Sequence, residues 1–536
     1  MRNSVLIALL VSLSISCLPS DGANILGVFT SHSPSHLIVH MSVMKALAEE
    51  GHNVTVVSSL EPKVTHKSIK HIVIPMSKED EKTLNKNMGD MTREKQSLFS
   101  TIKNLFGSFS MLIYKQLDVL EDKRFTELYT NKDNKFDAVV VGFFFNRYQV
   151  GLGSLFKCPI ILSWTSGPMD HINELMGNPV LISTVPNMNM PSDGKPMNFK
   201  QRMTNFASTM VFRLLGWYLD SLDTGFYDRM WGKIPHMLSF EEAKKNVSLL
   251  FCNSHALSEG PLRPNVPAVV EIGGIQIKQK PDPLPQDIKE FLDGAKDGAI
   301  LFSLGSNLKG DHIKPEIISN IFKTLSSLKQ RIIWKWEDVK HTPGKAANIL
   351  YKDWLPQDDI LAHPKIKLFI THAGKGGMAE AQYHAVPMLA LPVFADQPAN
   401  AEKLAEAGYG LALDLTNLEA DALKEAIKEL LANTKYTAKL KQFSQLYRDR
   451  PMTARDSVVY WTDYVVRYKG AVHMQSTLVH MNWLTSNNLD VYLILAVILV
   501  IVLKITKIVL KFFWRKCCGG KGKAEQSKQK SKVKKH

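Results

Sequence analysis

The sequence predicts an α/β protein with two doubly wound domains that face a cleft and one transmembrane helix near the C-terminus. Short runs rich in Val and Ile alternate with helical stretches, and this alternation restarts in the second half of the chain. An uncharged apolar run lies close to the C-terminal end. With 536 residues, 45% of them hydrophobic, the chain is long enough for two ordinary domains and several appendages.

Four apolar runs in the first half are predicted to be strands buried on both faces, because their apolar residues are continuous instead of alternating. Between the first two runs, residues 36–50 have helical spacing, and Gly51 follows as a stop signal. This β-α-β pattern is typical of a parallel sheet covered by helices. The four predicted strands are residues 24–30, 53–59, 136–142 and 159–164.

The second half repeats the pattern after a Pro-rich segment, residues 280–285, which marks the expected boundary between a domain of residues 23–280 and a domain of residues 281–452. Ligands of such sheets bind at the carboxyl ends of the strands. Residues 165–240 are rich in Met and aromatic side chains and form either helices and loops around a bound substrate or ordinary core helices. The predicted strands are residues 299–304, 331–336, 367–371, 388–394 and 410–413.

The N-terminal residues 1–22 resemble a secretory signal peptide. Arg2 supplies the positive end, residues 5–13 are apolar, and residues 20–22 offer small side chains for cleavage. A buried first helix is the alternative, but a strand-like run begins directly afterwards. The signal would place the two domains in the lumen of the endoplasmic reticulum.

Residues 489–513 are predicted to span a membrane once, and a buried core helix is the alternative. Residues 491–503 carry no charge, and the lysines that follow lie near one end, where their ammonium groups can reach lipid headgroups. The positive-inside rule places the basic tail, residues 514–536, in the cytosol. Its last five residues, 532–536, resemble a dilysine retrieval signal for the endoplasmic reticulum, although a solvated lysine tail has the same composition.

The formal net charge of +15 is concentrated at the C-terminal end. From Lys504 onward the chain carries 12 Lys or Arg and one Glu, so +11 of the charge lies there. The rest of the chain is close to balanced, and we therefore expect no nucleic-acid partner.

The cysteines support little, and two asparagines match a glycosylation pattern. Only two of the five cysteines, Cys158 and Cys252, lie in the predicted lumenal part, so we expect neither a disulfide framework nor a zinc site. Asn53 and Asn246 match the N-glycosylation pattern. Asn246 is the better candidate, because Asn53 opens a predicted buried strand.

The densest chemical signal is the run Phe369-Ile370-Thr371-His372-Ala373-Gly374-Lys375-Gly376-Gly377-Met378-Ala379-Glu380. It predicts a strand, a glycine-rich turn and the start of a helix. Glycines let the backbone approach an anion, and a helix N-terminus offers free N–H groups and partial positive charge. On its own such a turn is weak support for a ligand, since many tight strand-to-helix turns bind nothing.

The whole run, together with Pro387, Pro392 and Asp396-Gln397 downstream, resembles the signature of the UDP-glycosyltransferase family. The resemblance extends upstream to residues 354–357 and 303–306 and covers nearly the entire chain. It implies two Rossmann-like domains of the GT-B type and a UDP-sugar co-substrate with no further cofactor and no metal. It also implies that residues 453–488 form a helix that returns to the first domain, followed by a juxtamembrane segment. Because relatives associate in the membrane, a homo-oligomer is a further expectation.

Carried over residue by residue, the resemblance assigns most donor contacts to the second domain. Uracil would be held by Trp354 and Gln357, ribose hydroxyls by Glu380, and sugar hydroxyls by Asp396 and Gln397. Two positions depart from the family: Ala373 stands where Gly is usual, and Gly376 where many members carry Asn. The remaining UDP-sugar residues, in the diphosphate site and the uracil segment, are Ser306, Leu355, His372, Gly374, Gly376 and Gly377.

In the first domain His36 lies at a loop-to-helix junction after the first strand and is followed by Gly51-His52 at the family's spacing, so it resembles the family's catalytic histidine. By pattern alone, His32 and His40 are its rivals. A histidine can take the proton from an acceptor hydroxyl during inverting displacement of UDP. The family usually places an Asp beside this histidine, at the position of Gly142. Either another polar group such as Asn146 orients the ring, or His36 works unassisted.

Cys252 bears on the identity of the donor sugar. Glucuronyl-transferring relatives carry Arg at this position, and a thiol cannot pair with a sugar carboxylate as Arg can. We therefore expect transfer of glucose from UDP-glucose to a small lipophilic acceptor, with UDP-glucuronate as the alternative donor. A catalytically silent UDP-sugar-binding membrane protein is the alternative from another class, and Gly142 is the feature that favours it.

Overall fold

The structure, a computed structural model, describes residues 22–93, 111, 113–187, 190, 195–260, 262–306 and 308–518. Its first compact unit ends at Ser476 and its second begins at Thr477. The expected signal peptide, apart from Gly22, and the tail beyond Cys518 with its dilysine ending lie outside the described residues. Because both expected α/β domains fall in the first unit, the boundary between them stays a prediction.

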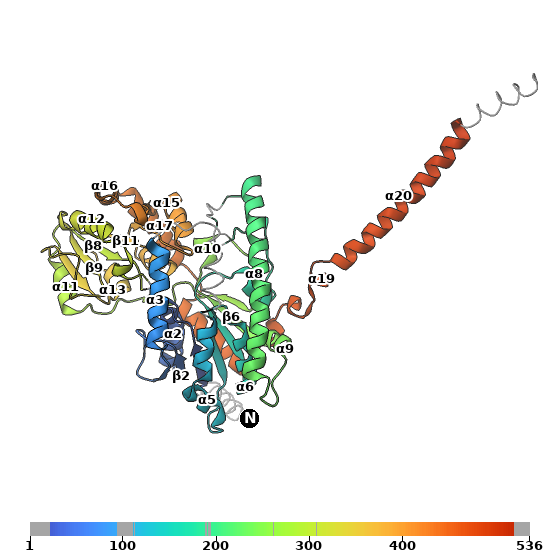
Figure 1. The fold of residues 1–536 in the computed structure, drawn as a ribbon, viewed down its shortest axis with the longest axis horizontal. Coiled ribbons are helices and arrows are strands. Elements are labelled where there is room, and N and C mark those ends of the chain that lie inside the picture. Colours follow the sequence, from blue (N-terminus) through green and yellow to red (C-terminus); the bar gives the residue numbers. More distant parts are fainter. Residues whose placement is uncertain are drawn as a thin grey trace, which may run out of the picture. The chain divides into compact units, whose positions relative to one another are not determined.

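The first half of the chain forms one parallel sheet, which includes the strands labelled β2 and β6 in Figure 1. Its seven strands have the order β3-β2-β1-β4-β5-β6-β7. The central β1 pairs with β2 on one side and with β4 on the other. Every residue of β4, β5 and β6 is buried, which is why their apolar runs are continuous. The strands are β1 (Asn24–Phe29), β2 (Asn53–Ser58), β3 (Ile69–Val73), β4 (Ala138–Gly142), β5 (Ile160–Trp164), β6 (Val247–Cys252) and β7 (Val269–Glu271).

Three strands of this sheet lie outside the predicted set. Strand β3 is an edge strand with half-exposed side chains, and β7 has only three residues, so neither gives a long apolar run. Strand β6 is fully buried but follows the weakly patterned region that obscures its start. Asn53 opens β2 as predicted, but its side chain is exposed beside Asn24.

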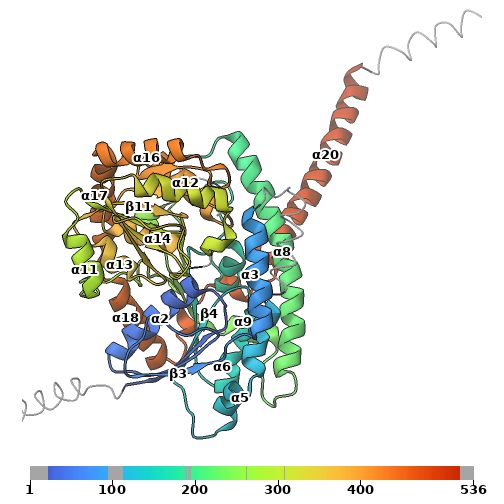
Figure 2. The same cartoon turned by 60° about the vertical axis from the view of Figure 1, so that its left-hand side comes forward.

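Helix α2 (Pro34–Glu49) connects β1 to β2 and starts earlier than predicted, because Pro34 fits its first turn. Helix α18 (Ala454–Arg467), from the end of the first unit, packs against α2, β4 and β6 (Figure 2). The remaining helical elements around this sheet are residues 113–121, α3 (Lys78–Arg93), α5 (Lys123–Thr130), η1 (Arg147–Val150), α6 (Gly151–Phe156), α7 (Asp170–Met176), α8 (Phe199–Trp231), α9 (Phe240–Lys245) and α10 (Ala256–Glu259).

The second half forms a sheet of six parallel strands in the order β10-β9-β8-β11-β12-β13. Strand β12 ends at Ala390 and not at residue 394 as predicted, because the N–H groups of Val393 and Phe394 donate to the Gln397 side chain instead of to a strand. The short edge strand β10 was not predicted. The strands are β8 (Ala299–Ser303), β9 (Arg331–Lys335), β10 (Ile349–Lys352), β11 (Ile366–Thr371), β12 (Met388–Ala390) and β13 (Gly410–Ala412).

Helices cover both faces of this second sheet and bury a separate apolar cluster on each. Helices α12 and α16 lie side by side over one face, as Figure 2 shows. The doubly wound class predicted from the sequence is therefore confirmed for both halves. The helical elements are α11 (Gln286–Asp293), η2 (Gly310–His312), α12 (Pro315–Ser326), α13 (Gln357–Leu361), α14 (Lys375–Tyr383), α15 (Gln397–Glu406), η3 (Leu415–Asn417), α16 (Ala420–Ala432), α17 (Lys435–Arg448) and η4 (Val472–Met474).

The second compact unit contains η5 (Thr477–His480), α19 (Trp483–Ser486) and the 30-residue helix α20 (Leu489–Cys518). Within α20, residues Leu489–Cys517 have a mean hydropathy of 2.9 in their most apolar window. A helix needs about 20 apolar residues to cross a bilayer. By length and composition, α20 is thus one helix of the described chain that can span a membrane. The span predicted from the sequence, residues 489–513, lies within this helix.

Candidate active site

The glycine-rich turn lies between β11 and α14, at the carboxyl end of the second sheet. Strand β11 ends at the buried Thr371, and Gly374 is the N-cap of α14, so the free N–H groups of the first turn of the helix face this edge. Methyl groups at Gly305 or Gly374 would overlap the imidazole of His372. These two glycines therefore make the space in which the histidine ring sits.

The imidazole of His372 is neutral near pH 7 in this setting. Burial, with a smaller effect of Lys335, lowers its pKa to about 4. Its Nδ1 atom is buried and has no hydrogen-bond partner among the described residues. The adjacent Ala373 has a φ of 61° and is 0% exposed, so its methyl group packs in the core and does not narrow the turn. A diphosphate could thus receive hydrogen bonds from the α14 N-terminus and from His372 together.

Two of the residues assigned to uridine are hydrogen-bonded to each other. Gln357 Nε2 donates to Glu380 Oε2 over 2.7 Å, and a methyl group at Gly377 would lie only 3.1 Å from that nitrogen. Trp354 is 37% exposed, and Lys63 Nζ lies 5.6 Å from its ring centroid. One indole face thus lies under the Lys63 ammonium group, so a flat partner would need the other face, whereas the Leu355 side chain is buried in the core.

The affinity for UDP is expected to rise about ten-fold between about pH 7 and about pH 9, because burial and Asp358 raise the pKa of Glu380 to about 8. A protonated carboxyl cannot accept from both ribose hydroxyls, whereas the carboxylate can. Calorimetric titration with UDP across this range measures the effect. Glu380→Gln is the matched control and should bind weakly without the pH dependence; a flat profile in the unmodified protein would contradict the assignment.

Asp396 and Gln397, assigned to the sugar, lie at the start of α15. Asp396 Oδ2 accepts from Asn400 Nδ2 over 2.7 Å. Gln397 Oε1 accepts from the backbone N–H groups of Val393 and Phe394, so the amide nitrogen is the part of this side chain that remains for a ligand. Ser306 is partly exposed at the end of β8.

Gly376 leaves room for the amide side chain that many relatives carry. A Cβ atom built there has no heavy atom within 4 Å. Gly376→Asn is therefore expected to lower the KM for the UDP-sugar by about three- to ten-fold, the effect of one added hydrogen bond of about 1 kcal/mol. Steady-state kinetics of UDP release measure it. Gly376→Ala supplies the same helix stabilisation without an amide, so an Asn variant that performs no better than Ala would refute the contact.

His36 lies in the first turn of α2, with its ring edge against Phe144 at a centroid distance of 4.8 Å. Burial lowers its pKa to about 4, so the imidazole is neutral near pH 7 and able to accept a proton. Its Nδ1 atom is buried without a hydrogen-bond partner. No carboxylate is among the causes that shift its pKa.

The space beside Gly142 is filled by another histidine. A Cβ at Gly142 would lie 2.9 Å from His40 Cδ2 and 3.0 Å from Phe29 Cδ1. His40 is buried, and its Nδ1 lies 2.8 Å from Ser163 Oγ, while its Nε2 has no partner. Asn146 does not replace the missing acid: its Oδ1 accepts from the Phe144 N–H, and its Nδ2 donates to the Gly142 carbonyl.

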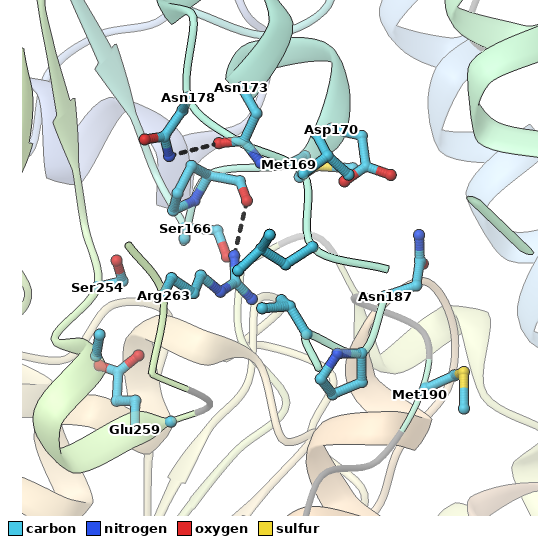
Figure 3. A pocket seen from close by; sticks show the side chains of 18 of the residues that line it. Ser166, Met169, Asp170, Asn173, Asn178, Asn187, Met190, Ser254, Glu259 and Arg263 are labelled. Atoms are coloured by element: carbon cyan, nitrogen blue, oxygen red, sulfur yellow. Dashed lines mark hydrogen bonds between the residues drawn. The ribbon is translucent and has the colours of Figure 1, made fainter. Parts of the chain in front are cut away.

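A cavity of about 160 Å³ lies between the two halves of the first unit (Figure 3). Its first-domain wall comes from residues 166–187, from α8 and from the segment after β6. The second half contributes Lys375, Asp396 and Lys403, so the sugar-assigned aspartate borders the same space. His36 is not among the lining residues, but the ring contacts from Phe144 through Phe145 to His171 connect it to this wall.

The basic residues of this cavity and Glu259 were not assigned to a site from the sequence. Arg263 Nη1 donates to the Pro168 carbonyl over 2.7 Å, and Lys375 Nζ lies 2.5 Å from Glu259 Oε2. Lys403 bonds to the carbonyl of Glu259 across the same gap. Only Lys375 could have been noticed, since it stands inside the glycine-rich run. Within the described ranges, no group of three or more His, Cys, Asp or Glu side chains is placed to hold a metal ion.

Two doubly wound parallel sheets, with a glycine-rich turn at the carboxyl edge of the second and a cavity between them, form a GT-B-like fold, which glycosyltransferases with nucleotide-sugar donors share. A family model described as "UDP-glucoronosyl and UDP-glucosyl transferase" matches residues 25–524. The chain belongs to this family and is a UDP-glycosyltransferase, with a UDP-sugar as its co-substrate. The family resemblance and the GT-B fold predicted from the sequence are confirmed.

Individual relatives and structures agree with this assignment. UDP-glycosyltransferase UGT4 of Dactylopius coccus is 34% identical over 91% of this chain and 95% of its own length. UDP-glucuronosyltransferase 1A1 of Mus musculus is 28% identical over 93% of this chain and 92% of its own length. A solved UDP-glucosyltransferase from Polygonum tinctorium, described as capable of glucosylating indoxyl, is 16% identical with a TM-score of 0.53 over 83% of this chain and 99% of its own, which shows a shared fold.

Proposed function

We propose that the enzyme transfers glucose from UDP-glucose, with inversion at the anomeric carbon, to a hydroxyl group of a small lipophilic acceptor. His36 removes the acceptor proton as the hydroxyl oxygen attacks, and the bond to the UDP oxygen breaks. The α14 N-terminus and the neutral His372 stabilise the negative charge that develops on the leaving diphosphate. Trp354, Gln357 and Glu380 hold the uridine.

One observation carries the choice of glucose. Cys252 is 0% exposed at the end of β6, and its side chain belongs to the core of the first domain. Burial raises the pKa of this thiol, so position 252 offers neither a cation nor an anion to the sugar. A donor with a neutral hydroxymethyl group needs no charged partner there, whereas a sugar carboxylate does.

A second donor, UDP-glucuronate, is supported by different residues. Arg263, Lys375 and Lys403 border the cavity next to Asp396, and the first two lie close enough to influence the Cys252 thiol. Arg263 could pair with a carboxylate through the guanidinium donors that the Pro168 carbonyl does not use. In this alternative, Arg263 supplies the positive charge that glucuronyl-transferring relatives place at the position of Cys252.

Side-by-side assays with the two donors test the proposal. The purified protein is incubated with UDP-glucose or UDP-glucuronate and a panel of phenols and steroids, and released UDP is measured. Faster turnover with UDP-glucose supports the proposal. Faster turnover with UDP-glucuronate that Arg263→Gln abolishes would establish the alternative. UDP binding without turnover on either donor would instead indicate a catalytically silent protein.

The expected location follows from the termini. A single-pass protein of the endoplasmic reticulum membrane, with α20 as its span and a basic cytosolic tail, suits acceptors that partition into lipid, as in detoxification. Asn53 and Asn246 are exposed at their side chains. If the domains are lumenal, treatment with an endoglycosidase should lower the mass of the protein, and Asn246→Gln should remove part of that change. A protein that carries no glycan would leave the lumenal orientation unsupported. Homo-oligomerisation stays a prediction.

A further inference from the structure

Helix α8 carries an unpartnered apolar stripe along the first twenty residues of its length. Five large side chains on it are between 51% and 71% exposed. With the half-buried Met210 they recur every three or four positions and so occupy one face over about 27 Å. The five exposed members of this stripe are Phe199, Met203, Phe206, Leu214 and Trp217.

The same face changes character farther along the helix. The next positions in the three-or-four series are Ser221, Thr224 and Asp228, which are exposed and polar. The opposite face stays buried against the first domain throughout, through residues such as Leu215 and Phe226. Packing within the protein therefore explains the buried face, whereas nothing in the described residues covers the apolar stripe. Exposed patches of this kind mark contact with a partner or a membrane.

Charge distinguishes between these two possibilities. Residues 195–219 contain Lys195, Lys200, Arg202 and Arg213 and no acidic residue. An apolar stripe with Phe, Leu and Trp, flanked by basic side chains, is the composition of helices that lie in the surface of a membrane. Trp217 and the exposed Tyr218 end the stripe with the amphipathic rings that favour the headgroup region.

We propose that the stripe of α8 lies in the surface of a lipid bilayer, with the exposed Lys200 and Arg202 against anionic headgroups. The same chain carries α20, whose length and composition suit a membrane span, so the helix meets lipid at a high effective concentration. The contact is a second attachment, additional to that of α20 itself.

This surface has a consequence for the acceptor. The inner side of α8 contributes Thr209 and Phe212 to the cavity between the two halves. A compound dissolved at the lipid surface would thus lie on the outer side of α8, and the inner side of the same helix forms part of the cavity wall. This consequence rests on the proposed function, whereas the membrane surface itself does not.

Lipid-chain quenching in the full-length protein tests the contact. An environment-sensitive fluorophore is attached to Leu214→Cys in a chain with Cys517→Ser and Cys518→Ser, reconstituted in phosphatidylcholine vesicles containing phosphatidylserine. Doxyl-labelled lipids should quench it about two-fold or more. Leu446→Cys is the matched control, since Leu446 is 63% exposed on α17 and Leu214 is 61% exposed on α8. Thr224→Cys controls for position on α8 itself.

Each outcome decides the proposal. Quenching at 214 with little at 446 and 224 supports it. Equal, weak quenching at all three positions overturns it, and so does a disulfide between two copies through Leu214→Cys, which would make the stripe a homodimer contact. In a second readout, the pair Leu214→Glu and Trp217→Glu should raise the KM several-fold for an acceptor that partitions into lipid. The KM for a water-soluble acceptor and UDP affinity should stay unchanged; a loss of UDP affinity as well would instead point to a failure of the fold.

Discussion

Replacement of His36 with alanine is expected to lower kcat about 100- to 10,000-fold, the usual contribution of a positioned general base. The acceptor proton then has no neutral imidazole to receive it. UDP affinity should stay within about two-fold, because the donor residues belong to the second domain. UDP release at saturating substrate measures the first effect, and calorimetric titration with UDP measures the second. Turnover that survives in His36→Ala would remove His36 from the mechanism.

His32 provides the control for this experiment. It lies in the loop directly before α2, its pKa is also lowered to about 4 by burial, and it lies near Asp118 and Lys115 instead of Phe144. His32→Ala should therefore retain most of the turnover. A large loss in His32→Ala, with little in His36→Ala, would transfer the role of the base to His32.

The same histidine predicts an unusual pH profile. A base must be unprotonated, and a pKa of about 4 keeps His36 in that form well below neutral pH. The value of kcat/KM for the acceptor, measured at saturating UDP-sugar so that ionisation of Glu380 does not limit donor binding, should thus be nearly flat from about pH 7 to about pH 5.5, where a histidine of ordinary pKa would lose about ten-fold. Activity falls only as the pH approaches about 4. A ten-fold loss by pH 5.5 in a folded enzyme would show that His36 has a partner that raises its pKa.

The donor turn was predictable because its geometry is local. An apolar run that ends at Thr371, glycines that need no space for a side chain, and a helix that begins at Lys375 are all features of adjacent residues. The buried central strands follow from the same kind of pattern. Edge strands such as β3 do not, because their half-exposed residues have no distinctive period.

The cavity was beyond prediction because its residues meet only in the folded chain. Glu259 accepts from Lys375, 116 positions away, and its carbonyl accepts from Lys403, 144 positions away. The sequence likewise shows that a carboxylate is missing at Gly142 but not what occupies the space. Neighbouring turns of α2 supply both His36 and the ring of His40 that fills it, and that contact depends on how α2 packs on β4.

Gly142→Asp is expected to destabilise the protein by about 3–5 kcal/mol, the cost of an unpaired buried charge. The new Cβ would lie 2.9 Å from His40 Cδ2, so the ring must move and the carboxylate enters a site built for a neutral imidazole. Chemical denaturation measures the loss. Gly142→Ala separates the steric part from the charge, because it introduces the same Cβ without a carboxylate. A Gly142→Asp protein as stable as the unmodified one would show that the His40 ring is not fixed there.

Without the His40 ring, the same Gly142→Asp substitution is expected to raise the pKa of His36. In His40→Ala with Gly142→Asp, the carboxylate has the volume that His40 vacates and can approach Nδ1 of His36, which has no partner in the present arrangement. A nearby carboxylate favours the imidazolium, so the pKa of His36 rises and the acid limb of kcat/KM moves from about 4 toward the ordinary value of 6.5. The His40→Ala single variant should show no such shift. If the double variant folds and its acid limb has the same pKa as that of His40→Ala, a carboxylate at position 142 does not contact His36. The histidine would then act as the base without a partner at the end of β4.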